Sequence, residues 1–116
     1  MKMEHVTIRV ADMEKSIAFY TDVIGLKIQR DMRPRAPIVF LAETPDDVPV
    51  ELIQETENIY KGSGIDVGFH CDDVQGAYDR LQAAGYELSE MRSPRPGVHF
   101  FYVKDPNGVS VQLIGE

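Results

Sequence analysis

Val6-Thr7-Ile8-Arg9-Val10 and Val67-Gly68-Phe69-His70-Cys71 decide the fold, because each alternates apolar residues with polar or small ones at the period of a β-strand. The two stretches lie 61 residues apart in the chain. Val50-Glu51-Leu52-Ile53 and Val111-Gln112-Leu113-Ile114 match at the same offset of 61. An offset shared by both ends of a long segment indicates that the chain is an internal duplication.

The first half is predicted to form a strand, a helix and three further strands. Asp12 can cap the helix and Gly25 can end it, with an apolar stripe at helical spacing between them. Proline-rich and turn-prone segments separate the later strands. The predicted elements are strand 6–10, helix 13–24, and strands 26–30, 38–41 and 48–54.

The second half repeats this order. Asp72, with Gln75 three residues later, resembles a capping box at the start of the helix, and Gly85 is expected to end it. Asp105-Pro106-Asn107-Gly108 is a strong turn signal. The predicted elements are strand 67–71, a helix whose apolar stripe runs from residue 74 to 81, and strands 86–88, 98–104 and 109–114.

Two βαβββ modules in tandem define the expected fold. Residues 1–54 and 65–116 form the repeats, residues 55–64 have the composition of a linker, and 116 residues are enough for one domain. The fold class is therefore α+β, with two curved mixed sheets around a cleft and the helices on their convex side. Alternation turns one residue set of each half toward the cleft: His5, Thr7, Arg9 and Glu51, and Asp66, Gly68, His70 and Gln112.

Composition favours a soluble globular protein, with 43% hydrophobic and 27% charged residues. The sequence has no apolar run of about 20 residues and only one cysteine, so a cytoplasmic location is expected and membrane association is not. A net charge of -7 opposes binding to nucleic acid. Two groups of arginines in loop-like sequence are either solvated or able to bind an anionic small molecule: Arg30, Arg33 and Arg35, and Arg92 and Arg95.

The two ends of the chain resemble the glyoxalase, bleomycin-resistance and dioxygenase superfamily, also called the vicinal oxygen chelate superfamily. Residues 5–20, followed by Gly25-Leu26, look like the opening of glyoxalase I, and residues 103–114 look like its closing hairpin. The resemblance covers nearly the whole chain and supports the fold strongly. It supports a function less, because such families include lyases, isomerases, dioxygenases, epimerases and non-catalytic drug-binding proteins.

The resemblance implies a divalent metal bound by one residue from each first strand and one from each last strand. The matching positions are His5, Glu51, Asp66 and Gln112. His5 and Glu51 keep the residue types of the family, whereas Asp66 replaces a histidine and Gln112 replaces a glutamate. Each of the four also has an ordinary explanation as a polar residue on a sheet face or at a strand end. Extra oxygen ligands shift the preference from Zn²⁺ toward Ni²⁺, Mn²⁺ or Mg²⁺.

The same resemblance suggests how a substrate would react and bind. A metal that chelates two neighbouring substrate oxygens favours loss of an α-proton, and Glu51, Asp66 or His70 would take that proton because glutamine cannot. Arg9 matches an arginine that binds a glutathione carboxylate, and Thr7 beside it is expected to contact substrate. Glu55 stands where the family has an asparagine, so glutathione recognition is only partly present.

Three functions follow as hypotheses. The first is a metal-dependent, glyoxalase-like lyase or isomerase acting on a small oxygenated substrate, and the second is a non-catalytic binder of a small molecule or antibiotic. The third is a different metalloenzyme of the superfamily, although a dioxygenase would be expected to have two histidines and one carboxylate where the sequence offers His5 alone. A homodimer is expected, and the sequence leaves open whether each cleft forms within one chain or across two.

Overall fold

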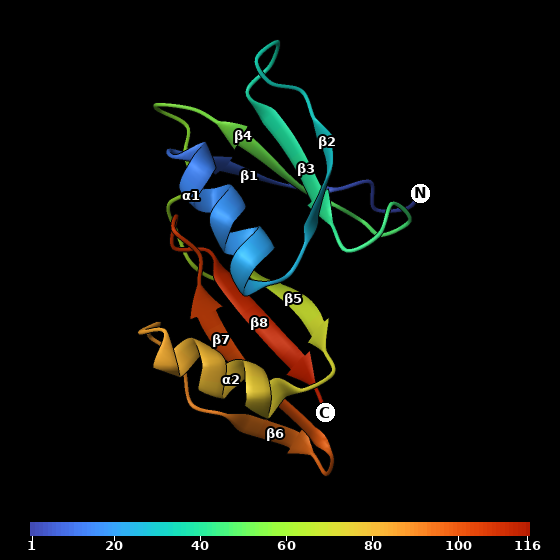
Figure 1. The fold of residues 1–116 in the computed structure, drawn as a ribbon, viewed down its shortest axis with the longest axis vertical. Helices are drawn as coiled ribbons and strands as arrows, with labels where there is room; N and C mark the ends of the chain where they lie inside the picture. The colour runs from blue at the N-terminus through green and yellow to red at the C-terminus, as the bar shows by residue number, and fades with distance from the viewer. The chain divides into compact units, whose positions relative to one another are not determined.

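Each half of the chain forms a four-stranded mixed sheet with helical structure packed on one face (Figure 1). The computed structural model describes residues 1–116. The chain divides into two units, Met1–Lys61 and Gly62–Glu116. The predicted α+β class with two βαβββ modules is confirmed.

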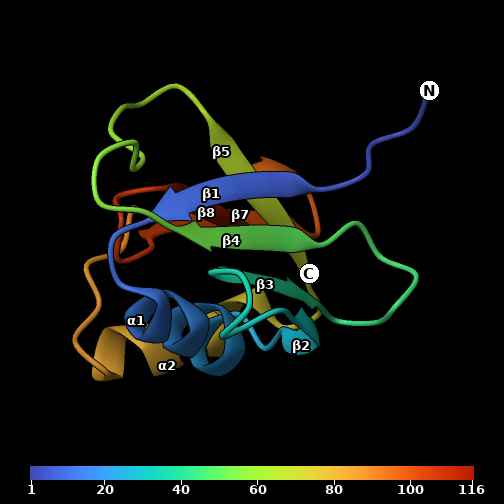
Figure 2. The same cartoon turned by 90° about the horizontal axis from the view of Figure 1, so that it is seen from above.

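Unit 1 contains one sheet with the strand order β1-β4-β3-β2. β1 and β4 are parallel, and the other pairs are antiparallel. Figure 2 shows α1 on one face of this sheet. The elements are β1 (Val6–Val10), α1 (Met13–Ala18), the π-helical turn η1 (Phe19–Val23), β2 (Lys27–Asp31), β3 (Ile38–Ala42) and β4 (Val50–Gln54).

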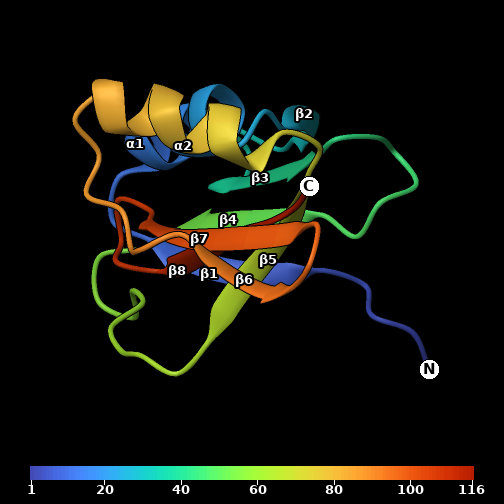
Figure 3. The same ribbon diagram turned by 90° about the horizontal axis from the view of Figure 1, so that it is seen from below.

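Unit 2 has the same topology, with the strand order β5-β8-β7-β6 and a parallel β5–β8 pair. Figure 3 shows α2 lying over β7 and β8, against which it packs. The elements are β5 (Asp66–Cys71), α2 (Val74–Ala83), β6 (Arg92–Arg95), β7 (Val98–Lys104) and β8 (Ser110–Gly115).

The strand registers of the two units are equivalent. Val6 pairs with Val50 in unit 1, and Val67 pairs with Val111 in unit 2, so both members of the parallel pair keep the offset of 61. The third strands differ by 62, since Leu52 pairs with Val39 and Leu113 pairs with Phe101. One extra residue is therefore inserted before β7, and it is lost again before β8.

Alternation along the strands separates a core face from a polar face. Apolar strand side chains on the helix side are almost completely buried in both units: Ile8, Val10, Val39, Leu41 and Leu52, and Phe101, Val103, Val111 and Leu113. Burial of each large side chain contributes about 1.5–3 kcal/mol. The residues between them on the strands therefore point away from the helices and are available for function.

The first helix is shorter than its apolar stripe predicts. Asp12 caps it as expected, accepting from the Lys15 amide at 3.1 Å, and Gly25 ends it with a φ of 89°. The α-helix itself stops at Ala18, and the chain continues as η1. The Thr21 hydroxyl donates to the Ile17 carbonyl at 2.8 Å, so a side chain competes for a carbonyl that an α-helix would use internally.

The cap of the second helix was predicted one residue too early. Asp73, not Asp72, accepts from the Gly76 amide, at 2.9 Å. Asp72 instead contacts the ring of His70.

The strand predicted at residues 86–88 is wrong, because Leu88 forms only an isolated bridge with Val103. The Ser89 hydroxyl accepts the Tyr102 amide at 2.8 Å and so replaces a backbone acceptor that would continue the ladder. The fourth strand is β6, at residues 92–95. In unit 1, β4 begins at Val50 rather than at residue 48, since Pro49 has no amide proton to donate.

The start of the predicted linker is bonded to unit 1. The Glu55 amide donates to the Val10 carbonyl at 2.9 Å, and the Tyr60 amide donates to the Arg9 carbonyl at 3.0 Å. No helix in the structure has the length and apolar character that crossing a membrane requires.

Candidate functional site

A row of paired residues crosses the polar face of the unit 1 sheet. Thr7 pairs with Glu51, Glu51 with Phe40, and Phe40 with Arg30, one residue from each strand. Because paired residues of neighbouring strands share a face, these four side chains lie on the face opposite the apolar core. We call this set, together with His5 just before β1, the unit 1 row.

Glu51 is the centre of the row. It is buried, with 8% of its surface exposed, although its side chain is acidic. Its Oε1 atom lies 3.4 Å from Nε2 of His5 and accepts a hydrogen bond from the Thr7 hydroxyl. The His5 ring also packs edge-on against Phe40, at a centroid distance of 6.0 Å. Histidine and threonine thus hold one oxygen of the carboxylate, and the second oxygen, which makes no hydrogen bond, is accessible rather than buried.

Gln112 occupies the equivalent position in unit 2. It pairs with Gly68 as Glu51 pairs with Thr7, and its Nε2 donates to the Tyr102 hydroxyl at 3.4 Å. A Cβ atom on Gly68 would lie 3.3 Å from Oε1 of Gln112, so the missing side chain leaves room at this amide. Asp66 is exposed at the first residue of β5, and no hydrogen bond joins it to Gln112.

Arg9 is paired within unit 1. Its guanidinium donates to Oε1 of Glu55 at 3.1 Å, and its side chain is 41% exposed. Glu55 lies in the segment with linker composition, which gives no sign of this partner. The positive charge expected to attract an anionic ligand is therefore largely balanced by a neighbouring carboxylate.

His70 lies farther along β5 than Gly68, on the same strand face. Its Nε2 is 2.9 Å from Oδ1 of Asp72, and both side chains are exposed. In the β5–β8 register it pairs with Ile114, two positions from the Gln112 pair. His70 is thus held by an exposed carboxylate at the end of the strand.

The structure brings together two of the four predicted metal ligands within one unit. No group of three or more His, Cys, Asp or Glu side chains gathers as a cation site. The His5–Glu51 pair nevertheless fits a divalent cation, since it offers an imidazole nitrogen and a carboxylate oxygen. In unit 2, Asp66 and Gln112 offer oxygen donors alone, the ligand type that hard six-coordinate ions prefer.

A hollow of about 670 Å³ opens in unit 1 beside the row. Its walls include His5, Gln29, Arg30 and Phe40, and the loop of residues 45–49 closes one side. Neither Gln29 nor Phe40 is among the residues predicted for the site. β3 is apolar at every position, so its sequence does not show which face Phe40 takes, and nothing in the sequence signals the position of Gln29.

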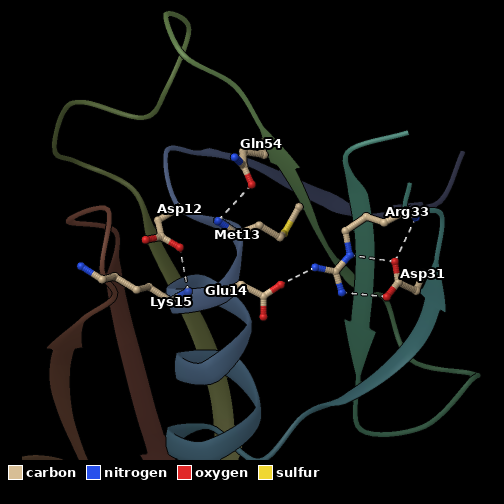
Figure 4. Close-up of polar contacts among 7 residues, drawn as sticks. All are labelled: Asp12, Met13, Glu14, Lys15, Asp31, Arg33 and Gln54. Atoms are coloured by element: carbon tan, nitrogen blue, oxygen red, sulfur yellow. Dashed lines mark hydrogen bonds and ion pairs between the residues drawn. The ribbon is translucent and has the colours of Figure 1, made fainter. Parts of the chain in front are cut away.

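Arg33, predicted as either a solvated or an anion-binding cation, is fully engaged within the protein (Figure 4). It donates to Oδ1 and Oδ2 of Asp31, at 3.0 and 2.8 Å, and to Glu14 on α1 at 2.6 Å. The guanidinium and the Arg33 amide lower the pKa of Asp31 to about 2. Arg33 therefore ties the β2–β3 connection to the start of α1.

The comparisons with known proteins agree with this architecture. A family model of the Glyoxalase/Bleomycin resistance protein/Dioxygenase superfamily matches residues 2–113. A probable lactoylglutathione lyase from Vibrio parahaemolyticus is 31% identical over 95% of this chain and 87% of its own length. The lactoylglutathione lyase of Salmonella typhimurium is 27% identical over 98% of this chain and 92% of its own.

Solved structures show the same likeness. The trypanothione-dependent glyoxalase I of Leishmania major superposes with a TM-score of 0.82 at 26% identity, covering 100% of this chain and 87% of its own. The duplicated βαβββ units, their common register and these matches lead to one conclusion: the chain belongs to the Glyoxalase/Bleomycin resistance protein/Dioxygenase superfamily.

Proposed function

We propose that this protein is a metal-dependent lyase or isomerase of the glyoxalase I type that acts on a small oxygenated substrate. The observation that carries the proposal is the buried Glu51 carboxylate with one oxygen held by His5 and Thr7. Its second oxygen is not buried without a partner, so it is accessible and can bind a cation or accept a proton. The relatives named lactoylglutathione lyase support the same class.

We propose His5, Glu51, Asp66 and Gln112 as the metal ligands, with residues 1–116 working as one domain. The donor set contains one nitrogen and three oxygens, so Ni²⁺, Mn²⁺ or Mg²⁺ is expected to bind in preference to Zn²⁺. When bound, the cation would polarise two neighbouring substrate oxygens and stabilise the negative charge that develops as an α-proton leaves.

Residues of the protein itself would accept the proton and orient the substrate. The carboxylate oxygen of Glu51 that makes no hydrogen bond can accept a proton. Thr7 fixes the carboxylate by donating to the other oxygen. Asp66 and His70 are the other proposed bases. Gln112 can orient substrate or metal through its amide, but it cannot accept a proton at neutral pH.

The substrate remains a small anion or neutral compound in this proposal. Because Arg9 is paired with Glu55, a glutathione carboxylate would have to displace an existing ion pair. Thr7 would contact substrate only on its side away from Glu51. A hemithioacetal is therefore the first substrate to assay, although another oxygenated compound fits the same chemistry.

Metal content after reconstitution tests the proposal most directly. We expect close to one equivalent of Ni²⁺ or Mn²⁺ per chain by elemental analysis, and a marked loss in Glu51→Gln, which keeps the shape but removes the charge. Isomerisation of the methylglyoxal–glutathione hemithioacetal is then assayed on the loaded protein. Less than about a tenth of an equivalent in the unaltered protein would overturn the metalloenzyme proposal.

The second candidate is a non-catalytic protein that binds a small molecule without metal. It is favoured by the amide of Gln112, which occupies the position where the family resemblance implies a carboxylate base. Ligand binding that is unchanged by a chelator would support this function. For either function we propose a cytoplasmic homodimer, and a monomeric mass by light scattering at micromolar concentration would contradict the dimer.

A further inference from the structure

A bulge in β2 decides where Arg30 points. Ile28 pairs with Leu41 and Arg30 pairs with the next residue, Phe40, so Gln29 is one residue in excess. In a bulge of this kind two consecutive residues oppose one residue of the partner strand. Gln29 and Arg30 therefore both lie beside Phe40, and both line the hollow. A regular strand would have turned one of them to the opposite face.

The bulge is held in place by its own side chain. The Gln29 amide donates to the Ala42 carbonyl at 3.0 Å. This bond occupies the side chain of Gln29 and leaves Arg30 as the group at the bulge that is free to meet a ligand. Arg30 thereby becomes the outermost member of the unit 1 row, on the far side of Phe40 from Glu51.

Arg30 differs from Arg9 and Arg33, which are both engaged in ion pairs. Arg9 is paired with Glu55, and Arg33 is paired with Asp31 and Glu14. No ion pair or hydrogen bond engages the side chain of Arg30, although it lines the hollow. A guanidinium at the wall of a hollow, beside an aromatic ring, suits a ligand that carries an anionic group next to an apolar or aromatic part.

The remaining charges of the hollow are distributed on other walls. Lys2 and Glu4 come from the segment before β1, and Asp46 and Asp47 come from the loop before β4. The Asp47 carboxylate is already bonded to the amide and hydroxyl of Thr44, at 3.1 and 3.0 Å. The acidic loop opposes an anion placed near it, so the geometry favours an anion on the β2 side of the hollow.

We propose that Arg30 forms a specificity subsite for the anionic group of a ligand whose apolar part rests on Phe40. The subsite deepens the proposed function, and it rests on that function only in taking the unit 1 row as the place where substrate binds. Arg30 supplies a positive charge at this wall of the hollow. Arg9 does not supply one, because it is already paired. The substrate class is thus a small carboxylate or phosphonate with an apolar portion.

Two matched probes test the subsite in the metal-free protein. Phenylacetate and phenylacetamide have nearly the same shape and differ in charge, and their affinities are measured by ¹H–¹⁵N NMR titration of the full chain. We expect phenylacetate to bind about three- to tenfold more tightly, the range for a partly exposed charge-assisted hydrogen bond. The chemical shifts of the backbone amides of residues 29, 30 and 40 should change as phenylacetate is added.

Three variants complete the experiment. Arg30→Gln should make the two affinities equal, Arg30→Lys should keep part of the preference, and Arg35→Gln should keep all of it. Arg35 is the matched control because it is exposed and does not line this hollow. The proposal is overturned if the unaltered protein shows no preference or if Arg30→Gln retains it. Since neither probe needs metal, a failure of metal loading counts against the proposed function alone.

Discussion

Gln112→Glu tests the proposed chemistry most sharply, because it changes charge and basicity at one position with almost no change of shape. The structure indicates that the site tolerates it. The Tyr102 hydroxyl, which now accepts from the amide at 3.4 Å, can rotate and donate to a carboxylate. On the other side, Gly68 has no side chain, so the tight contact that a Cβ would make there, at 3.3 Å from the oxygen, is avoided.

The expected gain follows from the role of a positioned base. A general base contributes about 10²–10⁴-fold in rate, or about 3–5 kcal/mol of barrier. The variant also replaces a neutral ligand by an anion, so affinity for a divalent cation should rise. We therefore expect tighter binding of Ni²⁺ or Mn²⁺ by calorimetry and, where hemithioacetal isomerisation is measurable, a faster reaction of the loaded protein.

The control for this experiment is Gln82→Glu, which makes the same charge change at an exposed position on α2. It should alter neither metal affinity nor activity. If Gln112→Glu gains metal affinity without activity, the natural substrate is not the hemithioacetal. If it changes neither property while the thermal unfolding curve is retained, Gln112 is not a metal ligand and the assignment based on the 61-residue repeat fails.

Three further changes address unit 1. Thr7→Val should weaken metal binding about 10–100-fold in calorimetry by freeing the bound carboxylate, with Thr7→Ser retaining it; an unchanged affinity would show that the hydroxyl does not position a ligand. Glu55→Gln should release Arg9 and strengthen binding of phenylacetate but not of phenylacetamide in NMR titrations, and equal effects on both would contradict the ion-pair argument. Asp31→Asn should make the free energy of unfolding in urea less sensitive to acid, because Arg33 lowers the pKa of Asp31 to about 2. The ion pair contributes fully to stability above the ordinary aspartate pKa of about 3.9, and this contribution is lost as the pH falls toward about 2. The same acid dependence in the variant would refute this assignment.

The repeated pattern of the sequence predicted the fold because it records the strand register directly. The offset of 61 that aligned residues 6–10 with 67–71 is the offset at which Val6–Val50 and Val67–Val111 pair in the two sheets. The errors arose where side chains replace backbone hydrogen bonds. The Thr21 hydroxyl alters the end of the first helix, and the Ser89 hydroxyl interrupts the strand predicted at residues 86–88.

The site was only partly accessible from the sequence. Alternation placed Thr7 and Glu51 on one face, and their contact agrees with that placement. The pairing of Arg9 with Glu55 was missed because it joins residues 46 positions apart, in a segment that resembles a linker. The direction of Arg30 was inaccessible for another reason: a single excess residue in β2 reverses which face a side chain takes, and no residue type marks that position.

The shared register of the parallel pairs has a consequence for redesign. Thr7 and Glu51 in unit 1 correspond to Gly68 and Gln112 in unit 2, so the hydroxyl donor and the carboxylate acceptor are both absent from the second half. The donor and the acceptor form a pair, with one residue on each of two neighbouring strands, that can be exchanged together. Introducing the pair into unit 2 takes the two substitutions Gly68→Thr and Gln112→Glu, and the residue 112 side chain must shift by a few tenths of an ångström because a Cβ on residue 68 would lie 3.3 Å from its oxygen.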